Sequence, residues 1–168
     1  MALIKQTSKQ YFSGLRILHL VFLAGLILFS AISFFLVFTG SMGKNSELKG
    51  ILTILVPGFL VAGIMGSYFI AKNRLLTLVD KDLNEKLSGY RAMMILKIAL
   101  LEGPALFAII SYQLTGNILF LGVAMIAVLL ILFVNPSKEK VAEELNLSTQ
   151  DRALIANDAV PVTEIETP

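Results

Sequence analysis

Apolar residues gather in four long runs, which polar and charged segments separate. The runs cover about residues 17–38, 51–71, 93–112 and 118–134. A helix needs about 20 apolar residues to cross the hydrocarbon core of a bilayer, at a rise of about 1.5 Å per residue. The first run is too long for the apolar core of a signal peptide, which has about 7–15 residues. The pattern therefore predicts four membrane-spanning helices, of which the fourth is the shortest.

The connections between these runs are short. Residues 40–50 form a polar loop bounded by glycines, and residues 72–91 are highly charged. Residues 114–117 read Leu-Thr-Gly-Asn, which favours a tight turn. Because short connections make consecutive helices antiparallel, the expected fold is all-α: a polytopic membrane four-helix up-down bundle over residues 17–134. Residues 1–16 precede it as a cytoplasmic N-terminal arm.

Within the charged connection, apolar residues recur at spacings of three and four. They are Leu75, Leu76, Val79 and Leu83. This spacing is typical of a short amphipathic helix that lies along the membrane surface.

The composition changes abruptly after the fourth run. Ser137 is placed to cap one short helix, and Ser148 with Asp151 has the spacing of a capping box that starts a second. We therefore expect short cytoplasmic C-terminal helices within residues 135–157. Residues 158–168 are acidic and contain proline, a composition that predicts a disordered end.

The overall composition agrees with a membrane protein. Of the 168 residues, 56% are hydrophobic and 15% are charged, and the mean hydropathy is +0.79. In a soluble domain about a quarter of the residues are charged. The charged residues also cluster outside the apolar runs, which indicates several membrane spans and not one large soluble core.

The placement of Lys and Arg predicts the orientation in the membrane. Eleven of these residues flank the runs on one side: Lys5, Lys9, Arg16, Lys72, Arg74, Lys81, Lys86, Arg91, Lys138, Lys140 and Arg152. Lys44 and Lys49 flank the other side, and Lys97 can snorkel toward the majority from near the start of the third run. Because basic residues stay on the cytoplasmic side, both termini are expected to be cytoplasmic, in the bacterial inner membrane.

Several classes of function are disfavoured. The chain has no Cys and a single His, His19, which excludes disulfides, thiolate metal sites and His-cluster metal sites. The net charge of +2, without a basic groove, does not indicate nucleic-acid binding. No phosphate-binding loop, nucleophile elbow or metal motif is present, so we expect neither an enzyme nor a bound cofactor or metal.

Glu102 is the one acidic residue within the four apolar runs, and it lies near the middle of the third. A charged side chain at such a depth costs roughly 2.5–3.5 kcal/mol on insertion scales, so it is a functional-site hypothesis. Low dielectric favours the neutral carboxyl, which can donate a hydrogen bond across helices. Three roles stay open: a structural interhelical hydrogen bond, a proton- or cation-binding carboxylate, and a partner of a basic group.

The helical turn around Glu102 is expected to be weakened. Pro104 has no N–H and leaves the carbonyl of Leu100 without its helical partner, while Gly103 loosens the same turn. In lipid such a carbonyl must find another partner. The supporting hydroxyl groups at mid-depth of the first run are those of Ser30 and Ser33.

Small residues in the second run are spaced to allow close helix contact. They are Gly58, Ala62, Gly63, Gly66 and Ser67. Two interpretations stay open, packing within one bundle and the face of a homo-oligomer.

The segment of residues 99–110, Ala-Leu-Leu-Glu-Gly-Pro-Ala-Leu-Phe-Ala-Ile-Ile, resembles the outer helix of the rotary ATPase proteolipids (subunit c). In that family a carboxylate, matched here by Glu102, binds the translocated proton or Na⁺. The resemblance is local. The connection of residues 72–91 lacks the Arg-Gln-Pro turn of that family, and Pro104 has no counterpart there.

A second resemblance covers more of the chain. The strings are Leu-Glu-Gly-Pro-Ala-Leu-Phe at 101–107, Leu-Thr-Gly-Asn at 114–117, Pro-Ser-Lys-Glu-Lys-Val at 136–141 and Glu-Leu-Asn-Leu at 144–147. Together they are similar to a family of uncharacterised bacterial four-span membrane proteins. This resemblance implies the four-span architecture and no particular activity.

These observations predict a non-enzymatic accessory or structural subunit in the membrane. The alternative is a small proton- or cation-coupled transporter that works as an oligomer, with Glu102 as the binding carboxylate. The expected partners are the lipid bilayer and either a second copy of the chain or another membrane protein.

Overall fold

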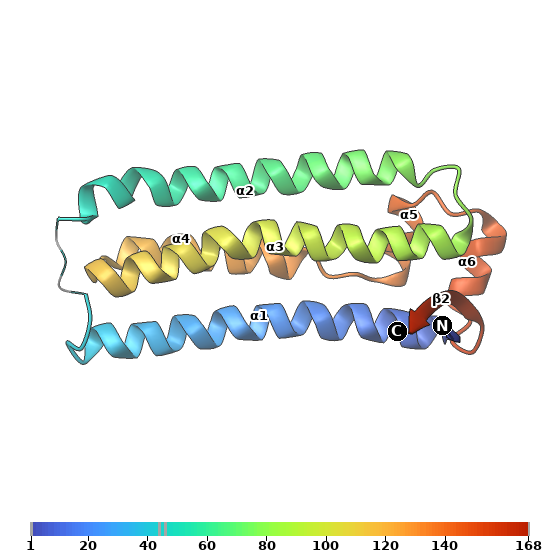
Figure 1. Cartoon of the computed structure of the whole chain (residues 1–168), viewed down its shortest axis with the longest axis horizontal. Helices are drawn as coiled ribbons and strands as arrows, with labels where there is room; N and C mark the ends of the chain where they lie inside the picture. The colour runs from blue at the N-terminus through green and yellow to red at the C-terminus, as the bar shows by residue number, and fades with distance from the viewer. Residues whose placement is uncertain (1, 44, 46, 168) are drawn as a thin grey trace. The chain divides into compact units, whose positions relative to one another are not determined.

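The computed structural model describes residues 2–43, 45 and 47–167, and for residues 2–4 and 165–167 it describes the backbone alone. Figure 1 shows the order of the elements along the chain. They are β1 (Ala2–Thr7), α1 (Ser8–Phe38), α2 (Lys49–Thr77), α3 (Leu83–Thr115), α4 (Ile118–Phe133), α5 (Lys138–Glu144), α6 (Thr149–Ala156) and β2 (Pro161–Thr167). The six helices contain most of the described residues, which confirms the predicted helical fold class.

Three helices, α1, α2 and α3, are each long and apolar enough to cross a membrane. Helix α4 has 16 residues and reaches that length only if α5, beyond a bend, is counted with it. The part of the chain that the structure describes therefore holds three candidate spans, or up to four. This confirms a helical membrane protein at the level of length and composition.

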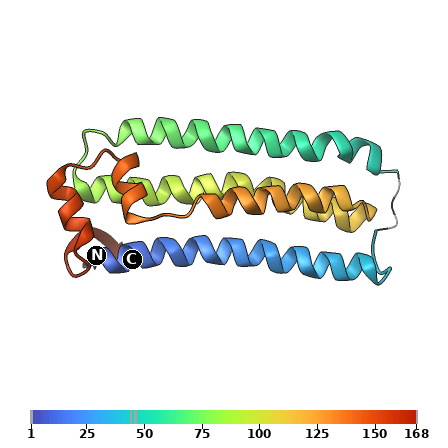
Figure 2. The ribbon, with the colours of Figure 1, turned by 180° about the vertical axis from the view of Figure 1, so that it is seen from behind.

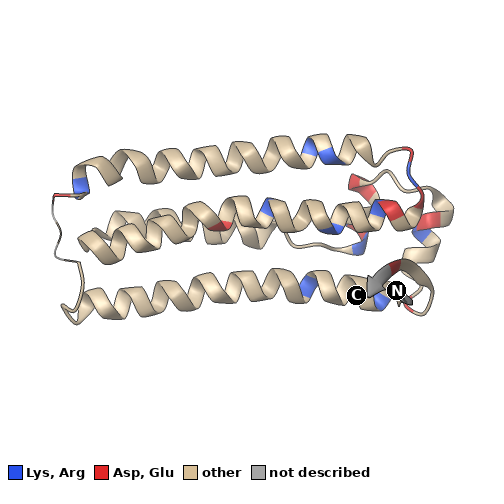
Figure 3. Cartoon of the chain, in the orientation of Figure 1, with Lys and Arg blue, Asp and Glu red and all other residues tan. Residues whose placement is uncertain are grey.

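The chain divides into two compact units. We call residues 2–19, 69–96 and 135–167 the polar unit, and residues 20–68 and 97–134 the apolar unit. The charged residues of the apolar unit are Lys44, Glu47, Lys49, Lys97 and Glu102, and all others belong to the polar unit. Figure 3 shows this unequal distribution.

The two ends of the chain form a small antiparallel sheet in the polar unit. Strand β1 pairs with β2 so that Ala2 lies opposite Thr167 and Lys5 opposite Glu164, with an irregularity between Gln6 and Thr7. The expected disorder of residues 158–168 is therefore wrong for β2. The reason is that its Val-Thr-Glu-Ile-Glu-Thr sequence favours a strand, and β1 supplies the backbone partner that composition alone does not reveal.

The charged connection between α2 and α3 is a turn, and the expected surface helix does not form within it. Helix α2 continues to Thr77, and α3 begins at Leu83. Asp82 caps the new helix, because its Oδ1 accepts a hydrogen bond from the backbone N–H of Glu85 at 2.8 Å. The apolar residues of this segment therefore belong mostly to the ends of two long helices.

Buried tyrosines join the helices of the polar unit. The hydroxyl of Tyr11 in α1 donates to the carbonyl of Leu87 in α3 at 2.6 Å. The hydroxyl of Tyr90 donates to Oε2 of Glu144 in α5 at 2.7 Å. Arg91 lies over the Tyr11 ring, with its guanidinium carbon 4.9 Å from the ring centroid. These contacts hold α5 and the base of α1 to the first turns of α3.

Helices α5 and α6 begin after the two serines expected to cap them. The Oγ of Ser137 accepts from the backbone N–H of Lys140 at 3.2 Å, and the Oγ of Ser148 accepts from that of Asp151 at 3.1 Å. Each serine satisfies an N–H that has no partner within its own helix.

In the apolar unit, two glycines in different turns approach each other closely. Gly43 and Gly116 have φ values of +88° and +68°, which favour glycine. A Cβ at Gly116 would lie 2.9 Å from the carbonyl oxygen of Gly43. The chain then doubles back as α4 (Figure 2). Asn117 caps the first turn of α4, because its Oδ1 accepts from the backbone N–H of Leu119.

Candidate functional site around Glu102

Glu102 lies on α3 in the apolar unit, at the border between a buried and an exposed face. Ile98 and Ala105 on its own face are buried, whereas Ala99 and Ile95 are exposed. The Glu102 residue is therefore partly exposed. The adjacent Gly103 has no heavy atom within 4 Å of the position that a Cβ would take.

Glu102 has no hydrogen bond or ion pair with any residue that the structure describes. Lys97, the nearest basic residue in the sequence, is not its partner. An unpaired carboxyl on a membrane-crossing helix costs free energy, so a partner from outside the chain would stabilise it. The structural hydrogen bond within one chain is thus not formed among the described residues.

The two serines expected near Glu102 are engaged elsewhere or unpaired. Ser33 donates to the carbonyl of Phe29 at 2.6 Å and accepts from Nε2 of Gln113 at 2.8 Å. Gln113 lies eleven residues beyond Glu102, which is about 16 Å along the helix axis. The Oγ of Ser30 is buried and has no hydrogen-bond partner in the described chain. Neither Ser30 nor Ser33 is therefore bonded to Glu102 in the part of the chain that the structure describes.

The turn of α3 that Pro104 weakens packs against helix α2. Helix α3 continues through Pro104 without ending, and the carbonyl oxygen of Leu100 lies against Gly63 of α2. A Cβ at Gly63 would meet that oxygen and would lie 2.7 Å from Cγ of Pro104. The close approach that small residues permit therefore occurs at the carbonyl that the proline leaves free.

The other small residues of α2 divide between two faces. Ser67 is buried on the face of Gly63 and donates to the carbonyl of Ile64 at 2.8 Å. Gly66 lies near the side chain of Leu100. Gly58 and Ala62 are exposed, and a Cβ at Gly58 would meet open space. The predicted packing stripe is thus one contact face around Gly63 and one exposed face around Gly58.

A single carboxyl of this kind can hold one proton or contribute one ligand to an ion. It forms no hydrogen bond or ion pair with a second titratable group of the described chain that could share acid–base chemistry. Within the described residues, no group of three or more His, Cys, Asp or Glu side chains could hold a metal ion.

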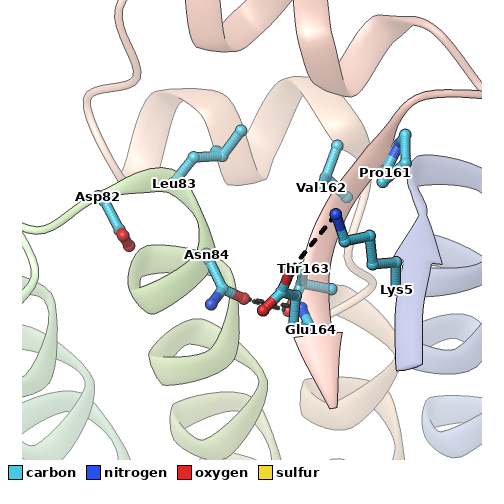
Figure 4. Close-up of a pocket in the computed structure, with 8 residues that line it drawn as sticks. All are labelled: Lys5, Asp82, Leu83, Asn84, Pro161, Val162, Thr163 and Glu164. Carbon is cyan, nitrogen blue, oxygen red and sulfur yellow. Dashed lines mark hydrogen bonds and ion pairs between the residues drawn. The ribbon is translucent and has the colours of Figure 1, made fainter. Parts of the chain in front are cut away.

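Sequence reasoning missed a second polar cluster, which lies in the polar unit. A pocket of about 460 Å³ lies between the first turn of α3 and the sheet (Figure 4). Oδ1 of Asn84 accepts from Oγ1 of Thr163 at 2.8 Å and from the N–H of Glu164 at 2.9 Å, and Lys5 lies 3.9 Å from Glu164. Asn84 therefore anchors β2 to α3. The one sequence feature that indicated this contact was Asn84 itself, an Asx residue at the start of a helix.

Comparisons with protein-family models, with curated proteins and with solved structures find no match to this chain.

Proposed function

We propose that the chain crosses the inner membrane of a bacterium four times, as an up-down bundle with both termini in the cytoplasm. Most of the charged segments expected in the cytoplasm belong to the polar unit, and most of the apolar runs belong to the apolar unit. The separation of charges between the two units supports this arrangement. Helix α4 is about 24 Å long at 1.5 Å per residue, a few ångströms short of a hydrocarbon core of about 30 Å. Local thinning of the bilayer accommodates such a mismatch at modest cost.

Within that membrane, we propose that the protein is a non-enzymatic accessory or structural subunit. The observation that supports this proposal is the carboxyl of Glu102 on α3, which has no partner among the described residues. Its cost is offset when a group of another protein, or of a second copy, accepts or donates a hydrogen bond there. The exposed small residues Gly58 and Ala62 would let a helix of another chain approach α2 closely, on a different face from that of Gly63.

The first test is purification from native membranes in a mild detergent, followed by native mass spectrometry. Glu102→Leu removes the carboxyl, Glu102→Gln keeps a hydrogen-bond donor, and Glu47→Gln is the control in an exposed loop of the same unit. We expect a stoichiometric partner or second copy to be retained in wild type, Glu102→Gln and Glu47→Gln, and to be lost in Glu102→Leu. An assembly that survives in Glu102→Leu would rule out this role for the carboxyl.

The second candidate function is a proton- or cation-coupled transporter. It is favoured by the partial exposure of Glu102 beside Gly103, where no heavy atom occupies the space that a Cβ would take. Flux into proteoliposomes would then disappear in Glu102→Gln, because the amide cannot release a proton. Size-exclusion profiles and helix content by circular dichroism verify that this variant is folded. Undiminished flux in folded Glu102→Gln would eliminate the transporter.

A further inference from the structure

A narrow groove of about 110 Å³ lies in the polar unit, between the end of α2 and the beginning of α3. Its lining residues are Arg74, Thr77, Leu78, Gly89, Ala92 and Leu96. All of them belong to the single helix–turn–helix segment of residues 69–96. Of the six, Arg74 alone carries a charge.

The wall that α3 contributes to the groove is apolar, and two of its three residues are small. Gly89, Ala92 and Leu96 are spaced by three and four residues, so they share one face of the helix. Ala92 and Leu96 are exposed. Gly89 cannot carry a side chain there, because a Cβ would collide with the side chain of Leu78 from the opposite wall. The side chain of Leu78 therefore fills the groove beside Gly89, whereas the groove stays open beside Ala92.

The wall that α2 contributes carries the guanidinium of Arg74. Arg74 is exposed, and its guanidinium makes no ion pair or hydrogen bond with the residues that the structure describes. The hydroxyl of Thr77 donates to the backbone carbonyl of Arg74 at 2.7 Å, one turn back along the same helix. The guanidinium thus keeps all its donors for an external ligand.

The groove straddles the expected boundary of the membrane. The second apolar run ends at about residue 71 and the third begins at about residue 93. At 1.5 Å per residue, Arg74 lies about 4–5 Å beyond the first boundary and Leu96 about 4–5 Å inside the second. The cationic end is therefore at the depth of lipid headgroups and the apolar end at the depth of acyl chains.

We propose that this groove binds an anionic phospholipid, with the phosphate on Arg74 and the upper part of one acyl chain along Ala92 and Leu96. Arginine suits a phosphate because its planar fork donates two parallel hydrogen bonds. An anionic lipid provides both a negative charge to pair with Arg74 and an apolar chain that fits the exposed wall. The proposal rests on embedding in a membrane, and on neither of the roles considered for Glu102.

The test titrates the purified full chain in detergent with phosphatidylglycerol and, separately, with phosphatidylcholine, and measures bound lipid by native mass spectrometry. Phosphatidylglycerol is expected to bind more tightly. Arg74→Gln is expected to weaken it about five-fold, the contribution of one basic residue at a membrane surface. Lys72→Gln is the matched control, since Lys72 is an exposed basic residue on the same helix that does not line this groove. It is expected to leave the affinity unchanged.

A second variant tests the apolar wall. Ala92→Phe fills the groove at an exposed position without touching the charge, and it is expected to weaken phosphatidylglycerol binding as well. Equal affinities for the two lipids, equal losses in Arg74→Gln and Lys72→Gln, or an unchanged affinity in Ala92→Phe would overturn the lipid site. Competition by millimolar inorganic phosphate would also overturn it, in favour of a phosphate site.

The same preparation separates failure of the groove from failure of membrane embedding. A chain that stays in the membrane fraction but shows no lipid preference contradicts the groove alone. A chain recovered in the soluble fraction without detergent contradicts the membrane protein itself.

Discussion

The backbone of Gly63 in α2 lies against the carbonyl oxygen of Leu100 in α3. That oxygen would normally accept the N–H of residue 104, which is proline. The ring of Pro104 reaches the same glycine. The carbonyl that lacks its helical hydrogen bond is therefore also the site of close contact between α2 and α3, two residues from Glu102.

Gly63→Ala is expected to destabilise the apolar unit, because the added methyl group would meet the Leu100 oxygen and the Pro104 ring. The free energy of unfolding should fall by about 1–3 kcal/mol, as in other overpacked positions. The control is Gly58→Ala, which meets open space on the same helix and should be neutral or stabilising by up to about 1 kcal/mol. Reversible unfolding in mixed micelles measures both. Equal effects of the two substitutions would contradict the close contact.

Substitution by alanine should have different effects on stability at the two neighbouring serines of α1, Ser30 and Ser33. Ser33→Ala removes the acceptor of the Gln113 amide and should cost about 0.6 kcal/mol, up to about 1.7, as membrane hydrogen bonds do. Ser30→Ala removes a buried hydroxyl that has no partner among the described residues, so it should be neutral or stabilising. The same unfolding measurement compares them. A larger loss from Ser30→Ala would reveal a ligand or water on that hydroxyl.

Tyr90→Phe is expected to loosen α5, because it removes the hydrogen bond to the Glu144 carboxylate. Hydrogen bonds to charged groups contribute about 1.5–3 kcal/mol, so amide hydrogen exchange within α5 should speed up by one to two orders of magnitude. Tyr112→Phe is the control, since Tyr112 is buried on the same helix and its hydroxyl has no partner in the described chain. Unchanged protection of α5 in Tyr90→Phe would show that this bond does not hold the helix.

The ion pair between Lys138 and Asp158 should make the polar unit sensitive to acid. The hydrogen bond from Lys138, at 2.7 Å, and its charge hold the pKa of the Asp158 carboxyl below its usual range. A lowered folded-state pKa gives stability above the unfolded value of about 3.9, and this is lost as pH falls through the folded value.

The stability difference between wild type and Asp158→Asn should therefore be constant from neutral pH to about pH 5 and shrink below about pH 4. Urea unfolding across this range measures it. Asp80→Asn in the exposed turn serves as control. A difference that grows on acidification would have the wrong sign for this pair.

The helical class and the caps at Ser137 and Ser148 could be read from the sequence because both depend on residues close together in the chain. The pattern of long apolar runs also located the candidate spans. It could not locate the helix ends, because a helix continues through polar turns outside the membrane: α1 begins at Ser8, well before its apolar run, and α3 begins at Leu83.

The sequence could not predict which side chains of the candidate site bond to each other. Whether Ser33 meets Glu102 or Gln113 depends on the rotation of two helices about their axes, which spacing within one helix does not fix. The strand at residues 161–167 was missed for a similar reason, because its partner lies at the opposite end of the chain.

The pairing of β1 with β2 also has a consequence for the order of assembly. At about 5–20 residues per second, the ribosome needs roughly 8–30 s to add the residues between the two strands. During that interval β1 has no partner, while the intervening helices are made. The sheet can therefore close only after β2 has been synthesised. Until then β1 presents an open strand edge, which is available for pairing with another chain.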